Sequence, residues 1–274
     1  MTRRLQSAAT FIALAFCVTA LRADIAVPPM RRLPGSSLDT SVRNEADRAI
    51  RQAARWLADR QQADGSWGGE SNRVQHTSLA LSALAALAAA NQPDPEYSDT
   101  IARAAVWLGG TETNRLDTLG DHAWRLIALS LAVPELPARQ QLLRRLAEQA
   151  AHTKENASAD DLQLWREARN QARIHPTPLP VYDCAIGVRA QVICEWSKPL
   201  ADNLAAWRLA HLINYADTSP FMNDGTPIDW RTHIAERLIN SQKSDPRGGG
   251  YWPAGTPDRQ LAETAYGLLS LLEL

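Results

Sequence analysis

Apolar residues recur along the chain at intervals of three and four, the spacing that places them on one face of an α-helix. From Asn44 onward this face is carried by Ala46, Ile50, Ala53, Ala54 and Leu57. Asp64-Gly65 should end the helix, because Gly adopts the positive φ that a tight turn needs. The Ala- and Leu-rich run after Ser78 then predicts a second helix, buried on all sides. The folded part of the chain is therefore expected to begin with a pair of helices.

The same pattern occurs again further along. "IARAAVWLGG" repeats the apolar spacing of "AIRQAARWLA", and Trp107 follows Trp56 by 107 − 56 = 51 residues, close to the period of repeated helical pairs. "GDHAWRLIALSLA" supplies the second helix of that pair. Further helices are expected over 137–151, 160–172, 183–196, 202–215 and 230–242, and "QLAETAYGLLSLLEL" is the last. About ten helices in five pairs, with no run of alternating residues typical of a strand, predict an all-α fold.

The first and last pairs resemble each other most closely. The corresponding residues are Leu57 and Leu238, Gln61 and Gln242, Trp67 and Trp252, and Thr77 and Thr264. The Gln61 amide is expected to donate either to the carbonyls that end its own helix or to the backbone of the next repeat. Trp67 is expected to fold back as an apolar plug whose indole N–H reaches a carbonyl. Because the two copies stand at opposite ends, we expect the ends of the domain to meet.

This motif, Gln-x-x-Asp-Gly-x-Trp between two helices, resembles the repeat of the squalene and terpenoid cyclases and of protein prenyltransferase β subunits. The resemblance is strongest over 49–90 and 235–274 and includes Gly250 in the last copy. It implies an α/α-toroid of the α6/α6-barrel type, here of about five hairpins, whose inner helices point at a central cavity; whether the ring is complete stays open. The Asp-x-Asp-Asp and Asp-Asp-x-x-Asp motifs of cyclases are absent, so cyclase activity is not expected.

The resemblance also raises the question of zinc, which prenyltransferase β subunits hold through an Asp, a Cys two residues later and a distant His. Here Asp183 and Cys184 are adjacent, so these two residues and His211 are only weak candidates. Asp183 fits a helix N-cap and Cys184 a small buried side chain. No metal and no cofactor are expected.

The first residues predict where the protein is located. Arg3 and Arg4 precede an apolar run over 8–21 and small-residue cleavage sites, the layout of a secretory signal peptide over 1–23. A linker over 24–40 and a domain over 41–274 follow. The apolar run is shorter than the roughly 20 residues that span a bilayer, so a periplasmic or extracellular protein that is not integral to the membrane is expected. Whether Cys184 and Cys194 form a disulfide stays open, since they would need a break between them.

The net charge and the distribution of basic residues limit the classes of partner to be expected. Lys and Arg number 29 against 30 for Asp and Glu, for a net charge of −1, and the basic residues are scattered, which disfavours nucleic acid.

The starts of the inner helices are expected to rim the cavity with His76, Thr77, Asp121, His122, Glu263 and Thr264. Helix N-termini attract anionic or hydroxylated ligands, and either His122 with Asp121 or His76 with Glu263 is a candidate for proton transfer.

A structural interpretation of the same residues is the alternative. In it, Thr77, Asp121 and Thr264 cap their helices, while His76 and Glu263 face solvent. The tryptophans divide in the same way: Trp124, Trp196, Trp207 and Trp230 either line a carbohydrate or lipid groove or pack in the core.

Together these observations predict an exported toroid without catalytic activity that binds a small molecule, lipid or protein partner in or over its cavity. The alternative is a periplasmic or extracellular lyase or hydrolase acting on polysaccharide or lipid, or a divergent terpenoid cyclase.

Overall fold

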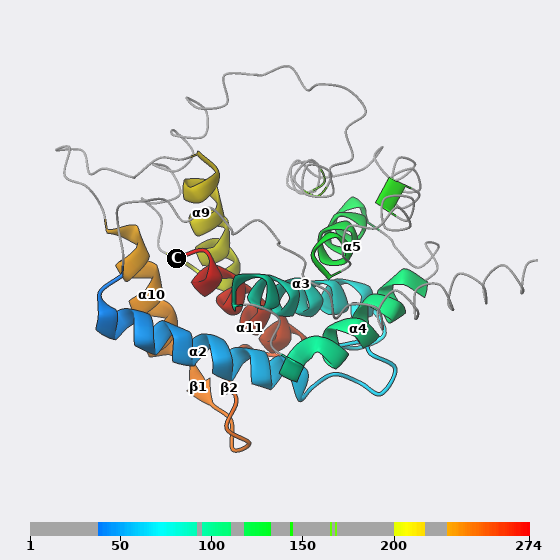
Figure 1. Ribbon diagram of the computed structural model, residues 1–274, viewed down its shortest axis with the longest axis horizontal. Helices are drawn as coiled ribbons and strands as arrows, with labels where there is room; N and C mark the ends of the chain where they lie inside the picture. The colour runs from blue at the N-terminus through cyan, green and yellow to red at the C-terminus, as the bar shows by residue number, and fades with distance from the viewer. Residues whose placement is uncertain are drawn as a thin grey trace, which may run out of the picture. The chain divides into compact units, whose positions relative to one another are not determined.

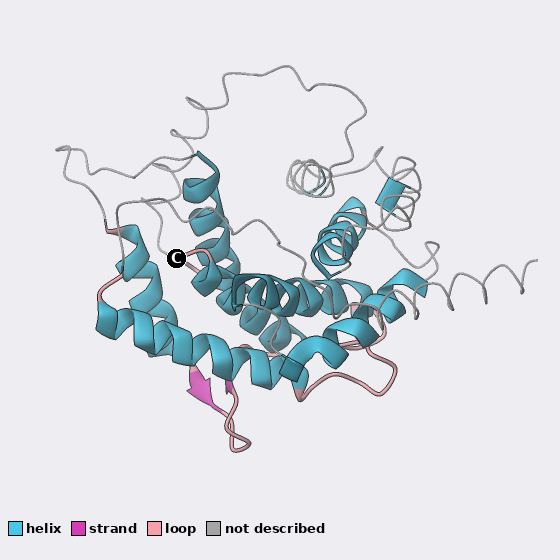
Figure 2. Ribbon diagram, viewed as in Figure 1, coloured by secondary structure: helices cyan, strands magenta, loops and turns pink. Residues whose placement is uncertain are grey.

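The computed structural model describes residues 38–91, 95–110, 118–132, 143–144, 165, 168, 200–216 and 229–274. Most of them are helical (Figure 2). The described helices are α2 (Thr40–Ala58), α3 (Arg73–Asn91), α4 (Pro95–Gly110), α5 (Leu119–Ala132), α9 (Asn203–Ala216), α10 (Trp230–Ser241) and α11 (Pro257–Leu272). The predicted all-α class is confirmed. The expected signal peptide, most of the expected linker and nearly all of the helices expected over 137–151, 160–172 and 183–196 lie outside the described residues.

Two short strands depart from the prediction that no strand would form. β1 (Lys243–Ser244) and β2 (Gly250–Tyr251) pair in antiparallel fashion, with Lys243 opposite Tyr251 and Ser244 opposite Gly250. Two residues are too few for an alternating pattern to show in the sequence. The strands form a hairpin between α10 and α11 (Figure 1).

The described residues divide into two compact units, of which one lies within Gln61–Pro176. It contains α3, α4 and α5, which all pack against one another. Every residue of α3 from His76 to Leu87 is buried. The apolar character of this helix on all its faces therefore has a direct structural reason.

The second unit joins Pro29–Arg60 to Thr177–Leu274. In it α11 packs against α9, α10 and α2, and α10 also packs against α2 and α9. The first described helix therefore lies beside the last helical pair, as Figure 1 shows for α2 and α10. Seven residues of α2 form its buried face: Ala46, Ala49, Ile50, Ala53, Ala54, Trp56 and Leu57.

Short polar side chains fix where these helices begin. Asp39 accepts a hydrogen bond from the Ser41 N–H at 2.8 Å before α2, and Asp229 accepts one from the Thr232 N–H at 3.2 Å before α10. Before α11, Thr256 is the N-cap and a Pro occupies the first turn, where its missing N–H costs nothing.

Candidate functional site

The repeat motif forms a compact joint that we call the first clasp: Gln61, Trp67 and Thr77. The Gln61 Nε2 donates to the carbonyl of Gly65 at 3.0 Å and to that of Thr100, in α4, at 2.8 Å. Trp67 is fully buried, and its backbone N–H donates to the Thr77 Oγ1 at 2.9 Å. The sequence left open whether the Gln61 amide donates to the end of its own helix or to the next repeat. Outside its own loop, it donates to the backbone of the next repeat.

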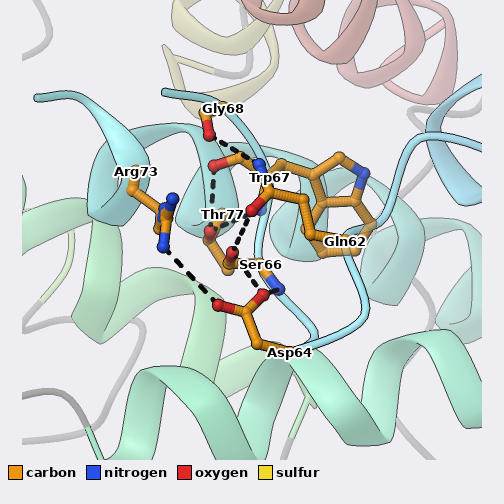
Figure 3. A network of polar contacts seen from close by, with 7 residues as sticks. All are labelled: Gln62, Asp64, Ser66, Trp67, Gly68, Arg73 and Thr77. Atoms are coloured by element: carbon orange, nitrogen blue, oxygen red, sulfur yellow. Dashed lines mark hydrogen bonds and ion pairs between the residues drawn. The ribbon is translucent and has the colours of Figure 1, made fainter. Parts of the chain in front are cut away.

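The turn inside the first clasp depends on Gly65 and Asp64. Gly65 has a φ of +93°, and a Cβ there would lie 2.7 Å from the Arg103 carbonyl oxygen. The Asp64 Oδ1 accepts from the Ser66 N–H at 3.0 Å and from its hydroxyl at 2.6 Å, and the Oδ2 lies 3.6 Å from the Arg73 Nη1 (Figure 3). The Ser66 hydroxyl is the main cause that holds the pKa of Asp64 below its ordinary value.

The last clasp consists of Gln242, Trp252 and Thr264. The Gln242 Nε2 donates to the carbonyl of Ala49, in α2, at 2.9 Å. Trp252 is 2 % exposed; its backbone N–H donates to the Thr264 Oγ1 at 3.3 Å and its indole Nε1 to the Leu238 carbonyl at 2.9 Å. The Leu238 carbonyl also accepts from the Gln242 N–H at 3.1 Å, so the indole is a further donor to the end of α10.

The two clasps bond equivalent positions of a neighbouring helix, α4 for the first and α2 for the last. Thr100 follows Ala49 by 100 − 49 = 51 residues, the same interval that separates Trp107 from Trp56. Both glutamines therefore donate to the same position of the repeat. This equivalence lies beyond what the aligned sequence motif alone predicts, since the motif contains only the donor.

The last clasp is longer than the first but keeps its geometry. Gln61 and Trp67 are 67 − 61 = 6 residues apart, whereas Gln242 and Trp252 are 252 − 242 = 10 residues apart. The four extra residues form β1 and β2, two on each arm of the turn. Because side chains in a strand alternate with a period of two, adding two residues to each arm leaves the Trp on the same face.

The turns within the two loops match as well. In the first, the Gln62 N–H donates to the Ser66 carbonyl at 2.8 Å; in the last, the Asp245 N–H donates to the Gly249 carbonyl at 2.8 Å. Gly250, in β2, is needed for a close approach, because a Cβ there would lie 2.8 Å from the Gln242 Cδ.

The second repeat replaces the indole by a guanidinium. Residues 111–117 contain no Trp, and the Arg125 Nε and Nη2 donate to the Leu108 carbonyl at 3.0 and 2.7 Å. Leu108 follows Leu57 by 108 − 57 = 51 residues and so corresponds to Leu238, the acceptor of the Trp252 indole. Arg125 is 2 % exposed, and burial lowers its pKa to about 10, so it remains charged at neutral pH.

Asp121 and His122 lie at the start of α5. Asp121 forms a capping box with Thr118: the Thr118 Oγ1 accepts from the Asp121 N–H at 3.1 Å, and the Asp121 Oδ2 accepts from the Thr118 hydroxyl at 2.9 Å. His122 is 4 % exposed, and burial, followed by the charge of Arg125, lowers its pKa to about 4. These contacts support the capping role of Asp121; the proton-transfer pair with His122 stays a prediction.

The other candidates at helix starts need correction. α3 begins at Arg73 and α11 at Pro257, so Thr77 and Thr264 lie inside their helices and do not cap them. His76 is 5 % exposed and does not face solvent. Thr77 and Thr264 instead receive the Trp backbone N–H groups described above.

Glu263 also has a different place from the solvent-facing one considered in the structural interpretation. It is half-buried, and its Oε2 accepts from the Asn203 N–H at 2.8 Å, at the N-terminus of α9. His76 and Glu263 belong to different units, so their pairing stays a prediction.

The tryptophans outside the clasps mostly pack in the core. Trp124 is 5 % exposed and Trp230 is 2 % exposed, which supports packing over a groove lining, and Trp196 lies outside the described residues. Trp207 is half-buried; its ring stacks on that of His211, with centroids 5.3 Å apart, and lies 5.9 Å from that of Tyr266.

His211 and Trp207 belong to a group that we call the α9–α11 cluster: Trp207, His211, Asn214, Tyr266 and Glu273. The His211 Nδ1 lies 3.0 Å from the Glu273 Oε1. The Asn214 Nδ2 donates to the Glu273 carbonyl at 2.7 Å and to its Oε2 at 2.8 Å. Burial acts to raise the pKa of Glu273, but the hydrogen bonds and the charge of His211 outweigh it and hold that pKa below its ordinary value.

Sequence reasoning missed Asn214, Glu273 and Arg125. The positions of Trp207, His211 and Asn214 are i, i+4 and i+7, which places them on one helix face and is the signal that was available. Glu273 comes from another helix, so only the packing of α9 on α11 reveals it.

Within the described ranges, no group of three or more His, Cys, Asp or Glu side chains is arranged to hold a metal ion. Of the weak zinc candidates, His211 belongs to the cluster above, while Asp183, Cys184 and the second cysteine, Cys194, lie outside the described residues. None of the helices described combines the length and the apolar character needed to cross a bilayer.

Comparison with known proteins found no matching family model, no similar curated protein and no similar solved structure.

Proposed function

We propose that this chain is an exported α/α-toroid of the terpenoid-cyclase type that binds a small molecule, lipid or protein partner without catalysing a reaction. The observation that carries the proposal is the repeated glutamine joint, in which Gln61 donates to Thr100 and Gln242 to the equivalent Ala49. A joint of one kind between a loop and the next outer helix, used at both ends of the sequence, is what a closed ring of hairpins requires.

The roles of the polar residues favour binding over catalysis. Thr77 and Thr264 accept hydrogen bonds from Trp backbone N–H groups, Asp121 bonds Thr118 just before α5, and Glu263 accepts from the first N–H of α9. A general acid or base works best with a pKa near the operating pH. The pKa of about 4 makes His122 a weak base at neutral pH.

Mass spectrometry of protein purified from the exported fraction of its own host tests the binding. The denatured chain should have a mass lacking roughly the first 23 residues, and the native form should be heavier by a retained ligand or partner. Native and denatured masses that agree, together with turnover of a polysaccharide or lipid, would contradict it.

A matched pair of variants tests the export. Replacing Arg3 and Arg4 by Glu removes the positive charge of the leader and should leave the full-length chain inside the cell, whereas Arg31→Glu and Arg32→Glu, beyond the cleavage sites, should not.

The ring is tested by X-ray scattering of the mature chain, which should give a radius of gyration of about 18 Å if the chain is compact. A markedly larger value would contradict closure.

A further inference from the structure

The ends of α9 and α11 are joined through Glu273. Glu273 is the C-cap of α11, and its N–H donates to the Ser270 carbonyl at 3.2 Å. Both oxygens of its carboxylate have partners on α9, His211 for Oε1 and Asn214 for Oε2, and Asn214 also bonds the Glu273 carbonyl. The last turn of α11 is therefore attached to α9 by side chains as well as by apolar packing.

Only one of these attachments responds to protons near neutral pH. The Asn214 amide does not titrate, whereas an imidazole changes charge within the range of pH 5 to 8. The His211 side chain is 36 % exposed and that of Glu273 is 15 % exposed, so protons reach the pair. Trp207 stacks on the imidazole and limits its rotation.

Other charged groups of α9, α10 and α11 have contacts of their own. Among the described groups, His211 is the one whose charge acts on Glu273. Arg208 of α9 and Glu263 of α11 act on Tyr266 instead. Arg237 of α10 donates to the carbonyls of Leu200 and Asp202, which precede α9.

We propose that His211 and Glu273 form a proton-sensitive latch that fastens the end of α11 to α9 most firmly when His211 is protonated. A charged imidazole adds an ionic attraction to the hydrogen bond that the neutral ring already gives. The lowered pKa of Glu273 keeps the carboxylate ionised under mildly acidic conditions. The latch is strongest there, weakens as His211 loses its proton at higher pH, and weakens again when Glu273 is protonated in stronger acid. Asn214 holds α11 throughout, so the latch changes in strength and does not open completely.

NMR titration of the full chain tests the coupling. The His211 resonance is assigned by its loss in His211→Asn, and its midpoint is compared between the wild type and Glu273→Gln. Removal of the carboxylate charge should lower the His211 midpoint by about half a pH unit or more, while His233 on α10 should titrate alike in both proteins. Equal His211 midpoints in the two proteins would overturn the proposal.

Hydrogen exchange, corrected for the intrinsic effect of pH, tests the fastening. Amides over 268–274 should be better protected at pH 5.5 than at pH 8 in the wild type, and this difference should vanish in His211→Asn and in Glu273→Gln. Asn214→Ala should lower protection at both pH values and keep the difference. A difference that survives in His211→Asn would overturn the latch, and this variant decides the matter even if Glu273→Gln fails to fold.

Discussion

The first and last clasps share their glutamine joint but contact the tryptophan of the bonded helix, Trp107 of α4 or Trp56 of α2, in different ways. In the first, the indole of Trp107 contributes a hydrogen bond to the carboxylate of Asp64. In the last, Trp56 stacks on Tyr251, with ring centroids 5.8 Å apart, and the Arg60 guanidinium lies 3.8 Å from the Trp56 ring centroid. The β1–β2 hairpin supplies Tyr251, so the longer loop exchanges a polar contact for an aromatic one.

This difference separates two kinds of requirement. The contacts that recur satisfy backbone groups. In each clasp a glutamine donates to a carbonyl of a neighbouring helix, and a threonine accepts from the Trp N–H. The contacts that vary are between side chains. Buried backbone groups must have partners in every repeat, whereas several arrangements can cover an indole ring. The second repeat extends the rule, because Arg125 serves the Leu108 carbonyl where no indole is present.

The largest effect is expected from Trp252→Ala. The change removes a buried ring together with its hydrogen bond to the Leu238 carbonyl, so the free energy of unfolding should fall by about 3 to 5 kcal/mol. Urea unfolding measures it. Trp252→Phe, which keeps an aromatic ring but loses the hydrogen bond, should cost clearly less. If both variants are as stable as the wild type, the indole does not hold the last clasp together.

A smaller effect is expected from Arg125→Met, which tests whether the guanidinium takes over the task of the indole. The Met side chain fills part of the space but removes both guanidinium hydrogen bonds to the buried Leu108 carbonyl, a loss of about 1 to 3 kcal/mol in the free energy of unfolding. Arg125→Lys, which keeps a donor and the charge, should lie between Met and the wild type. Equal stability of Arg125→Met and the wild type would show that Leu108 needs no donor from α5.

Gln242→Ala comes next. Loss of the hydrogen bond to Ala49 should lower the free energy of unfolding by about 1 kcal/mol. Gln61→Ala removes the equivalent bond to Thr100 and also the bond to Gly65, so it should cost at least as much. Exposed Asn44→Ala on α2, which also removes a side-chain amide, would serve as a control of unchanged stability. A large effect of one glutamine and none of the other would end the claim that the joints are equivalent.

Local sequence was enough to predict the first clasp. Gln61, Asp64, Gly65 and Trp67 lie within seven residues, and each has a task that its own chemistry dictates. The helix start of α11 was also readable, because Thr256-Pro257 is an N-cap followed by the residue that suits the first turn. Reading this signal would have placed Thr264 inside the helix and not at its cap.

What could not be predicted depends on contacts between elements. The role of Arg125 follows from the absence of a Trp in the preceding loop and from the packing of α5 on α4. Glu273 acquires its partners only when α11 lies on α9. The lowered pKa of His122 is likewise a consequence of burial, which periodicity in α5 does not determine for a polar residue.

At neutral pH the smallest effect of all is expected at His122, and it should grow with acid. Its folded pKa of about 4 lies below the ordinary value of 6.5, so between these values the unfolded chain binds a proton that the folded chain does not. The stability contribution is therefore complete above about pH 6.5 and is lost as the pH falls toward 4.

In His122→Gln this loss should be absent, so that the difference in urea midpoint between pH 7 and pH 5 is smaller than in the wild type. Exposed His233→Gln is the matched control and should keep the wild-type difference. His122 occupies the position at which Thr77 and Thr264 receive the Trp N–H in the other clasps, and a threonine has no such dependence on pH. If His122→Gln loses as much stability in acid as the wild type, His122 does not cause the pH dependence. The second repeat would then differ from the other two only in using the Arg125 guanidinium.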